Sequence, residues 1–120
     1  MGIRNYRDLV AWQRAMDLAE HVYGVTKSFP VEERYVLTAQ MRKSAVSVPS
    51  NIAEGQGLRS DGAFGRHLSI ARGSLWELET QLLLSARLGY IDRAESERLA
   101  ELASEVGKSV AGLSHAVSLP

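Results

Sequence analysis

Residues 61–88 read DGAFGRHLSIARGSLWELETQLLLSARL, and this segment sets the class of the fold. Apolar or small side chains recur along it at alternating steps of four and three residues, at Phe64, Leu68, Ala71, Leu75, Leu78, Leu82 and Ser85. That spacing is typical of a helix that buries one face in a bundle. Further apolar side chains lie off this seam, at Ile70, Trp76, Leu83 and Leu84. We therefore expect this helix either to be central in the bundle or to pack against another subunit.

The same helical periodicity predicts three further helices, over residues 7–28, 30–54 and 92–118. Short segments connect them, and no stretch shows the alternation of a strand. Four helices with short connections predict a single domain over residues 1–120. We expect an all-α fold, an antiparallel up-down-up-down four-helix bundle.

Proline and glycine mark the ends of the predicted helices. Pro30 separates the first two, because the residue before a proline is disfavoured in the α region. The polar, glycine-rich segment EGQGLRSDG, residues 54–62, separates the second helix from the third, and Gly89 is typical of a helix end. The expected N-terminal caps are Ser60 or Asp61 for the third helix and Asp92 for the fourth.

Pro49 lies inside the second predicted helix. A proline there costs about 3 kcal/mol and leaves the carbonyl of Ala45 without its helical donor. The helix must either kink at Pro49 or stop at Val48. Because the apolar stripe resumes in phase at Ile52, we expect one helix that is kinked at Pro49 and ends at Gly55.

Composition excludes several classes of protein. Fourteen basic and fourteen acidic side chains balance, so any binding to a polyanion requires a local patch of charge. The chain has no cysteine, and no apolar run resembles a signal peptide or reaches the length of a membrane span. We expect a soluble, cytoplasmic protein with no membrane partner.

No catalytic or metal-binding motif is present in the sequence. His21, His67 and His115 fall on three different predicted helices, and none has a second metal ligand three or four residues further on. No serine lies in a Gly-x-Ser-x-Gly motif. We expect no catalytic residue, no metal, no cofactor and no enzymatic activity.

Charge is unevenly distributed along this neutral chain. The segment from residue 42 to residue 72 holds two acidic side chains against five basic ones, namely Arg42, Lys43, Arg59, Arg66 and Arg72. Residues 73–120 hold four basic side chains against seven acidic ones. The basic side chains form either an ordinary solvated surface or a site where guanidinium groups bind phosphates.

The second predicted helix carries polar residues on or beside its core stripe, at Gln40, Asn51 and Glu54. They form either a hydrogen-bonded network near Pro49 or a ligand site. Asn51 and Glu54 are candidates to bind the backbone groups that the proline frees, and Gly55 is a candidate for positive φ.

Three segments together resemble a known family: YRDLVAWQRAMDLAEHVY, FPVEERYVLTAQMRKSAVSVPSNIAEG and FGRHLSIARGSLWELETQLLLSARLGYI, within residues 6–91. The chain resembles the bacterial four-helix-bundle proteins encoded in intervening sequences of 23S ribosomal RNA genes, which are related to accessory proteins of diversity-generating retroelements. The segment from Pro49 to Gly55 contains the family's structural signature, with Asn51 and Glu54 between them. The resemblance implies a ring-like homopentamer without catalytic residues and a link to ribosomal or other nucleic acid.

The sequence thus predicts a non-enzymatic homo-oligomer that binds ribosomal or other structured RNA, or a ribonucleoprotein, through the five basic residues. The alternative is a protein-binding adaptor or scaffold, for example an accessory subunit of a nucleoprotein complex. Such an adaptor would use an exposed apolar groove that involves Trp12 or Trp76.

Overall fold

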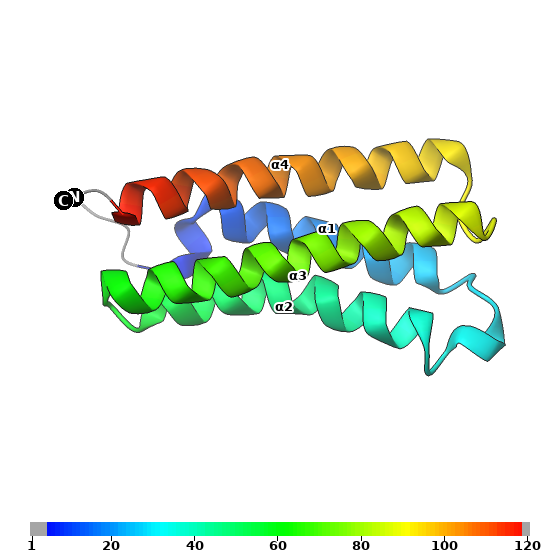
Figure 1. The fold of residues 1–120 in the computed structure, drawn as a ribbon, viewed down its shortest axis with the longest axis horizontal. Helices are drawn as coiled ribbons and strands as arrows, with labels where there is room; N and C mark the ends of the chain where they lie inside the picture. Colours follow the sequence, from blue (N-terminus) through cyan, green and yellow to red (C-terminus); the bar gives the residue numbers. More distant parts are fainter. Residues whose placement is uncertain (1–4, 119–120) are drawn as a thin grey trace.

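The computed structural model describes residues 5–118. Four α-helices make up most of this range: α1 (Val10–Thr26), α2 (Leu37–Gly57), α3 (Asp61–Arg87) and α4 (Arg93–Ser118). Two short 3₁₀ helices, Tyr6–Asp8 and Val31–Glu33, precede α1 and α2. Each α-helix packs against two neighbours, α1 against α2 and α4, and α3 against α2 and α4. Figure 1 shows the four helices side by side and running in alternating directions, which confirms the predicted four-helix bundle.

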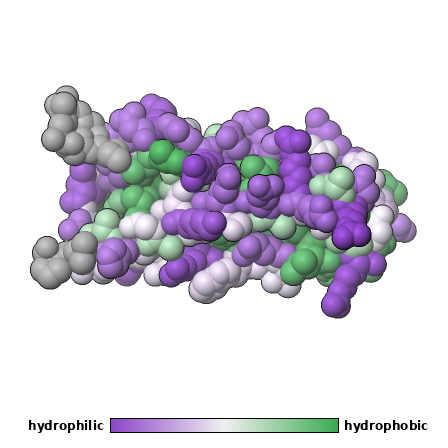
Figure 2. Space-filling view, turned by 90° about the horizontal axis from the view of Figure 1, so that it is seen from above, coloured by the Kyte–Doolittle hydropathy of each residue, from purple (hydrophilic) through white to green (hydrophobic). Residues whose placement is uncertain are grey.

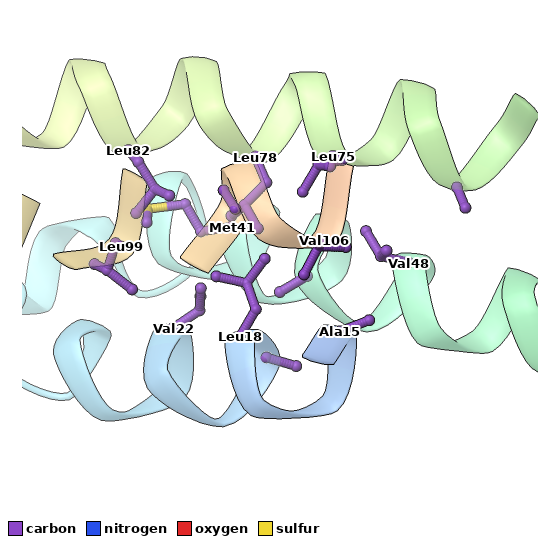
Figure 3. Packing of buried hydrophobic residues seen from close by; sticks show 14 of the residues in the cluster. Ala15, Leu18, Val22, Met41, Val48, Leu75, Leu78, Leu82, Leu99 and Val106 are labelled. Atoms are coloured by element: carbon purple, nitrogen blue, oxygen red, sulfur yellow. The ribbon is translucent and has the colours of Figure 1, made fainter. Parts of the chain in front are cut away.

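The core lies along the central axis of the bundle. Figure 3 shows apolar side chains from all four helices meeting there, among them Leu18, Val22, Met41, Val48, Leu75, Leu78, Leu99 and Val106. Burying a leucine or valine side chain stabilises a fold by about 1.5–3 kcal/mol. The seam predicted for α3 is buried from Leu68 to Ser85. The hydroxyl of Ser85 bonds back to the carbonyl of Gln81 at 2.8 Å, so a polar residue is accommodated in the core.

The connection between α1 and α2 differs from the prediction. The helix expected over 30–54 begins only at Leu37, because Pro30 has an extended ψ of 142° and Val36 adopts φ −119° and ψ −99°. Glu33 explains this path. Its carboxylate accepts hydrogen bonds from the hydroxyl of Tyr90 at 2.9 Å and from the backbone N–H of Leu37 at 3.4 Å. The connection is therefore held against the α3–α4 turn instead of continuing as helix.

The hydrogen bond from Tyr90 to Glu33 also changes an acid–base property. It stabilises the neutral phenol, and together with the negative charge of Glu33 it raises the pKa of Tyr90 above the usual value of about 10. The ring of Tyr90 also packs against Phe29, with centroids 5.3 Å apart. Two connections at one end of the bundle are thus joined by a polar and an aromatic contact.

The first helix is also shorter than expected, running from 10 to 26 instead of 7 to 28. Tyr6–Asp8 forms a 3₁₀ turn because the side chain of Asn5 accepts a hydrogen bond from the backbone N–H of Arg7 at 2.9 Å. That bond caps the short turn, and Leu9, in an extended conformation, separates it from α1. Asn5 therefore caps the 3₁₀ turn and not α1.

The second helix does not stop at Val48. It continues through the buried Pro49 and ends at Gly57, two residues beyond Gly55. The continuation agrees with the apolar stripe that resumes at Ile52, which is fully buried. The kink at Pro49 stays a prediction.

The other helix ends follow the sequence closely. The Ser60 hydroxyl accepts from the N–H of Ala63 at 3.3 Å and caps α3, and the Asp92 carboxylate accepts from the N–H of Glu95 at 2.8 Å and caps α4. Gly89 has φ 78° just past the end of α3, and the backbone N–H of Tyr90 donates to the carbonyl of Ser85 at 2.9 Å. This is the Schellman arrangement that a glycine stop predicts.

The outer face of α4 is mostly polar. Figure 2 views the molecule from this side and shows hydrophilic residues along its length, with hydrophobic residues confined to separate patches. The buried residues of α4 lie on one stripe that faces the core, at Leu99, Ala103, Val106 and Val110. Within residues 5–118, no helix combines the length and the apolarity needed to cross a membrane.

Candidate nucleic-acid interface

Among the glycines of α2 and α3, Gly55 lies closest to the neighbouring helix. A Cβ atom built on Gly55 would lie 2.7 Å from the Cβ of His67 and 3.1 Å from Cδ1 of Phe64. The predicted positive φ at Gly55 is wrong, because Gly55 lies inside α2 and the positive φ values belong to Arg59 and Gly89. Gly55 is required for close packing and not for a turn.

A polar ladder joins α2 to α3 beside this contact, and we use that name for Ser47, Asn51, His67 and Ser74. The two serine hydroxyls are 2.7 Å apart, the Asn51 amide nitrogen donates to Ser47 Oγ at 3.1 Å, and Asn51 Oδ1 lies 3.0 Å from Nδ1 of His67. Asn51 also donates to the carbonyl of Ser47 at 2.9 Å. These contacts make Asn51 a member of a hydrogen-bonded network, the first of the two alternatives.

The predicted network differs in its members. The carbonyl that Asn51 bonds belongs to Ser47 and not to Ala45, which is the residue that Pro49 frees. Glu54 and Gln40 are exposed and contribute no side chain to the ladder. Ser47 lies one turn before Asn51 on the same face of α2, but His67 and Ser74 belong to α3, so sequence spacing alone did not group the four residues.

One further polar group lies on this side of α3. Gln81 is seven residues beyond Ser74, on the same helix face. Its Oε1 atom is buried and has no hydrogen-bond partner among residues 5–118. A buried acceptor without a partner destabilises the fold.

The structure does not bring the five predicted basic residues into one patch. Lys43 lines a groove between α2 and α3, and Arg72 lines another between α3 and α4. Arg59 and Arg66 lie at the end of the bundle where α2 connects to α3. Arg42 is 15 residues before the end of α2, about 22 Å along the helix axis, and faces α1.

Two of these arginines rest on aromatic rings. The guanidinium carbon of Arg42 lies 4.7 Å from the ring centroid of Tyr23, and that of Arg72 lies 5.7 Å from the ring centroid of Trp76. A guanidinium over an aromatic ring is held in place by a cation–π interaction. Both arginines are half-buried, so their charged groups have restricted positions at the surface.

Four of the five basic residues have no direct salt bridge within residues 5–118. Within residues 5–118 the one salt bridge joins Arg93 to Glu97 on the exposed side of α4, at 3.1 Å. Arg42, Lys43, Arg66 and Arg72 therefore have no carboxylate within salt-bridge distance in this part of the chain. Arg59 differs from the others in its backbone, which has φ 59° in the left-handed region.

Sequence reasoning missed two cations that accompany Arg42. Lys27 and Arg34 lie in the connection between α1 and α2 and line the same pocket as Arg42, with a volume of about 390 Å³. Both residues are outside the 42–72 segment in which the basic charge was counted. Their grouping depends on the path of the connection, which the sequence did not predict.

Apolar side chains are exposed on two different sides of the bundle. A groove of about 600 Å³ runs between α1 and α2 and is lined by Tyr6, Trp12, Met16, Tyr23, Val46 and Pro49, among others. Trp12 is half-buried there, edge-on to Tyr6 with centroids 5.4 Å apart. On α3, the residues that lie off the seam are exposed, with Trp76 at 60% and Leu83 at 64%. These side chains are not covered by the bundle, so α3 does not bury more than one face within the single chain. Packing of this outer face against another subunit stays a prediction.

Metal ligands do not converge in the part of the chain that the structure covers. Among residues 5–118 there is no group of three or more histidine, aspartate or glutamate side chains that could hold a metal ion. His67 belongs to the polar ladder, where Asn51 is its partner.

Comparison with known proteins agrees with the fold and the motifs. A family model described as 23S rRNA-intervening sequence protein matches residues 7–112. A solved structure of a protein with unknown function from the S23 ribosomal protein family of Bacteroides thetaiotaomicron VPI-5482 superposes with a TM-score of 0.81. The two share 25% sequence identity, and the match covers 88% of this chain and 96% of the other. No curated protein matches the chain. The chain belongs to the 23S rRNA-intervening sequence protein family, a family of four-helix bundles for which no specific role is shown.

Proposed function

We propose that this protein is a non-enzymatic homo-oligomer that binds structured RNA through Arg42, Lys43, Arg59, Arg66 and Arg72. The observation that carries the proposal is the absence of salt bridges from Arg42, Lys43, Arg66 and Arg72 within residues 5–118. Cations without carboxylate partners are available to pair with phosphates, and this pairing releases counterions from the RNA. Their separation along the bundle suits an extended polyanion better than a compact ligand.

Self-association increases this charge. The α1–α2 groove and the outer face of α3 are apolar surfaces on different sides of one chain. An interface between unlike faces is heterologous, and repeated copies close into a ring when the rotation between them allows it. Five copies, the number that the family resemblance implies, would repeat each basic residue around the ring and raise the local positive potential.

The test is fluorescence anisotropy of a structured RNA at several salt concentrations. Arg66→Gln/Arg72→Gln removes two phosphate contacts per chain, so the slope of log affinity against log salt should fall by about 1.4–1.8 for each chain in contact with the RNA. Arg87→Gln/Arg98→Gln is the matched control, because it removes the same charge from exposed positions outside the proposed interface. A slope that is the same in the two double variants would refute the RNA interface.

The adaptor alternative depends on the same α1–α2 groove. Met16 is 37% exposed within it, and Met16→Glu places a charge on its apolar wall. If the groove seats a second copy, light scattering should show that this variant falls to a lower mass. If the variant keeps its assembly and its RNA affinity, the groove is available to a different protein and self-association through it is wrong.

A further inference from the structure

The pocket between the end of α1 and the start of α2 contains three cations and no acid. Lys27, Arg34 and Arg42 line it, and its wall includes the hydroxyl-bearing residues Thr26 and Thr38. No aspartate or glutamate lines the pocket. Its volume of about 390 Å³ falls within the range of about 300–1,000 Å³ that small-ligand sites occupy.

Arg42 is fixed in the orientation that an anion requires. Its Nε donates a hydrogen bond to Oγ1 of Thr26 at 2.9 Å, and its guanidinium lies over the ring of Tyr23. The two terminal nitrogens have no hydrogen-bond partner among residues 5–118. A guanidinium that is held at Nε and free at both terminal nitrogens presents two parallel donors, the geometry that binds phosphate or carboxylate in a bidentate manner.

Thr38 adds a hydroxyl group to the wall of the pocket. The residue is only 7% exposed, lines the pocket, and has no side-chain hydrogen bond to any residue from 5 to 118. Gln81 Oε1 is the one fully buried polar side-chain atom without a partner within residues 5–118, so the Thr38 hydroxyl keeps some exposure and is accessible as a donor. An oxygen atom of a ligand in the pocket would accept this hydrogen bond.

Glu33 and two carbonyls at the end of α1 already accept hydrogen bonds. Glu33 accepts from Tyr90 and from the N–H of Leu37, and it does not line the pocket. At the end of α1, the carbonyls of Val22 and Val25 accept from the hydroxyls of Thr26 and Ser28. Glu32, which follows the lining residue Val31, is exposed and does not line the pocket, so the three cations are the charged groups on the pocket wall.

From this geometry we infer that the pocket binds one phosphate group, which we call the Arg42 phosphate site. A phosphate monoester carries a charge of about −1.5 to −2 at pH 7 and has three acceptor oxygens, which fits three cations and a donor hydroxyl. A phosphate at the end of an RNA chain and a free phosphate ester share this chemistry. An RNA end as the source of the phosphate rests on the proposed function, whereas phosphate binding at the site does not.

The first test titrates the whole protein with inorganic phosphate at constant ionic strength and follows the melting temperature. A ligand that binds the native state raises it in a concentration-dependent manner. Arg42→Lys loses the bidentate donors and should weaken phosphate binding about 10- to 100-fold, and Thr38→Val removes one hydroxyl and should weaken it about two- to tenfold. Arg98→Gln on α4 is the control and should bind phosphate as the wild type does.

A purely structural role for Arg42 at the end of α1 gives a different result. Arg42→Lys would then lower the melting temperature equally with and without phosphate, and Thr38→Val would leave the phosphate response unchanged. That result, or a wild type that responds to phosphate no more than to chloride, overturns the site.

The second test compares one RNA sequence with a 5′-phosphate and with a 5′-hydroxyl. Tighter binding of the phosphorylated RNA to the wild type, with no such difference in Arg42→Lys, assigns the site to an RNA end. Equal binding of the two RNAs, with the inorganic phosphate response intact, assigns it to a free phosphate ester. Failure of the proposed function would appear separately, as a protein that binds neither RNA while still responding to phosphate.

Discussion

Replacing Gly55 with alanine tests whether α2 and α3 depend on a glycine at their closest contact. The added Cβ would lie 2.7 Å from the Cβ of His67 and 3.3 Å from the Cα of Phe64. Carbon atoms pack best at about 3.5–4.0 Å. Neither of these neighbouring atoms can rotate away, because one is a backbone atom and the other is attached directly to the backbone. The two helices must therefore move apart.

The expected loss of stability follows from two opposing effects. Overpacking of this kind costs about 1–3 kcal/mol, and the fixed neighbours favour the upper part of that range. Alanine recovers about 0.8–1.0 kcal/mol through its higher helix propensity. We expect a net loss of about 1–2 kcal/mol. An unfolding entropy of about 2.1 cal/mol/K per residue makes this a fall of about 4–8 °C in Tm for a chain of this length.

The assay is thermal and urea unfolding followed by circular dichroism, at one fixed protein concentration, so that the proposed self-association contributes equally to every measurement. Gly112→Ala is the matched control, since Gly112 lies within α4 and has no atom within 4 Å of the position of its Cβ. It should raise stability by up to about 1 kcal/mol. If Gly55→Ala is as stable as the wild type, the packing argument is refuted.

Three other substitutions test features of the described fold. Gln81→Met removes the buried acceptor that has no partner, so it should raise the free energy of unfolding by about 1–3 kcal/mol. A lower urea midpoint would instead show that Gln81 has a partner in solution. Arg59→Gly relieves the left-handed backbone and should be more stable than Arg59→Ala by about 1–2 kcal/mol, because both variants lose the same side chain. Equal stability of the two variants would contradict the backbone argument, and both should lower RNA affinity. In the wild type, the raised pKa of Tyr90 means that the unfolded chain ionises first, so stability is complete below about pH 10 and falls as pH rises through the folded pKa. Tyr90→Phe should therefore show a shallower loss of stability above pH 10, and identical pH profiles would refute the contribution of the bond to Glu33.

Local signals were sufficient to predict the four helices and the ends of α3 and α4. The three-four spacing of α3 predicted its buried seam, since the core requires a continuous stripe on one helix face. Ser60, Gly89 and Asp92 act through bonds to residues only a few positions away. Interactions of that range can be identified from sequence.

The start of α2 was predicted wrongly because it depends on a distant residue. Pro30 is acceptable in a first helical turn, and two glutamates follow it, so the local pattern favours a helix there. Tyr90 overrides that preference, because it holds Glu33 from 57 positions away in sequence. Arg59 was equally unpredictable, since a left-handed backbone is uncommon at residues other than glycine.

The candidate sites show the same division. Composition identified an excess of basic residues between 42 and 72, but only the packing of α1 against α2 places Arg42 beside Lys27 and Arg34. Gly55 was predicted to have a positive φ, but the structure shows that a glycine is needed there because α3 lies so close. Sequence therefore predicted which residue types matter and not which of them meet.

The polar ladder determines how α2 and α3 are aligned along their axes. Apolar stripes alone tolerate a slip of one helical turn, about 5.4 Å, because similar side chains recur at that interval. Such a slip would separate Ser47 from Ser74 and Asn51 from His67, and it would move the side chains of Phe64 and His67 relative to Gly55. Buried polar pairs specify a helix register in this way in coiled coils. The ladder thus favours one register between these two helices over registers that are shifted by a turn.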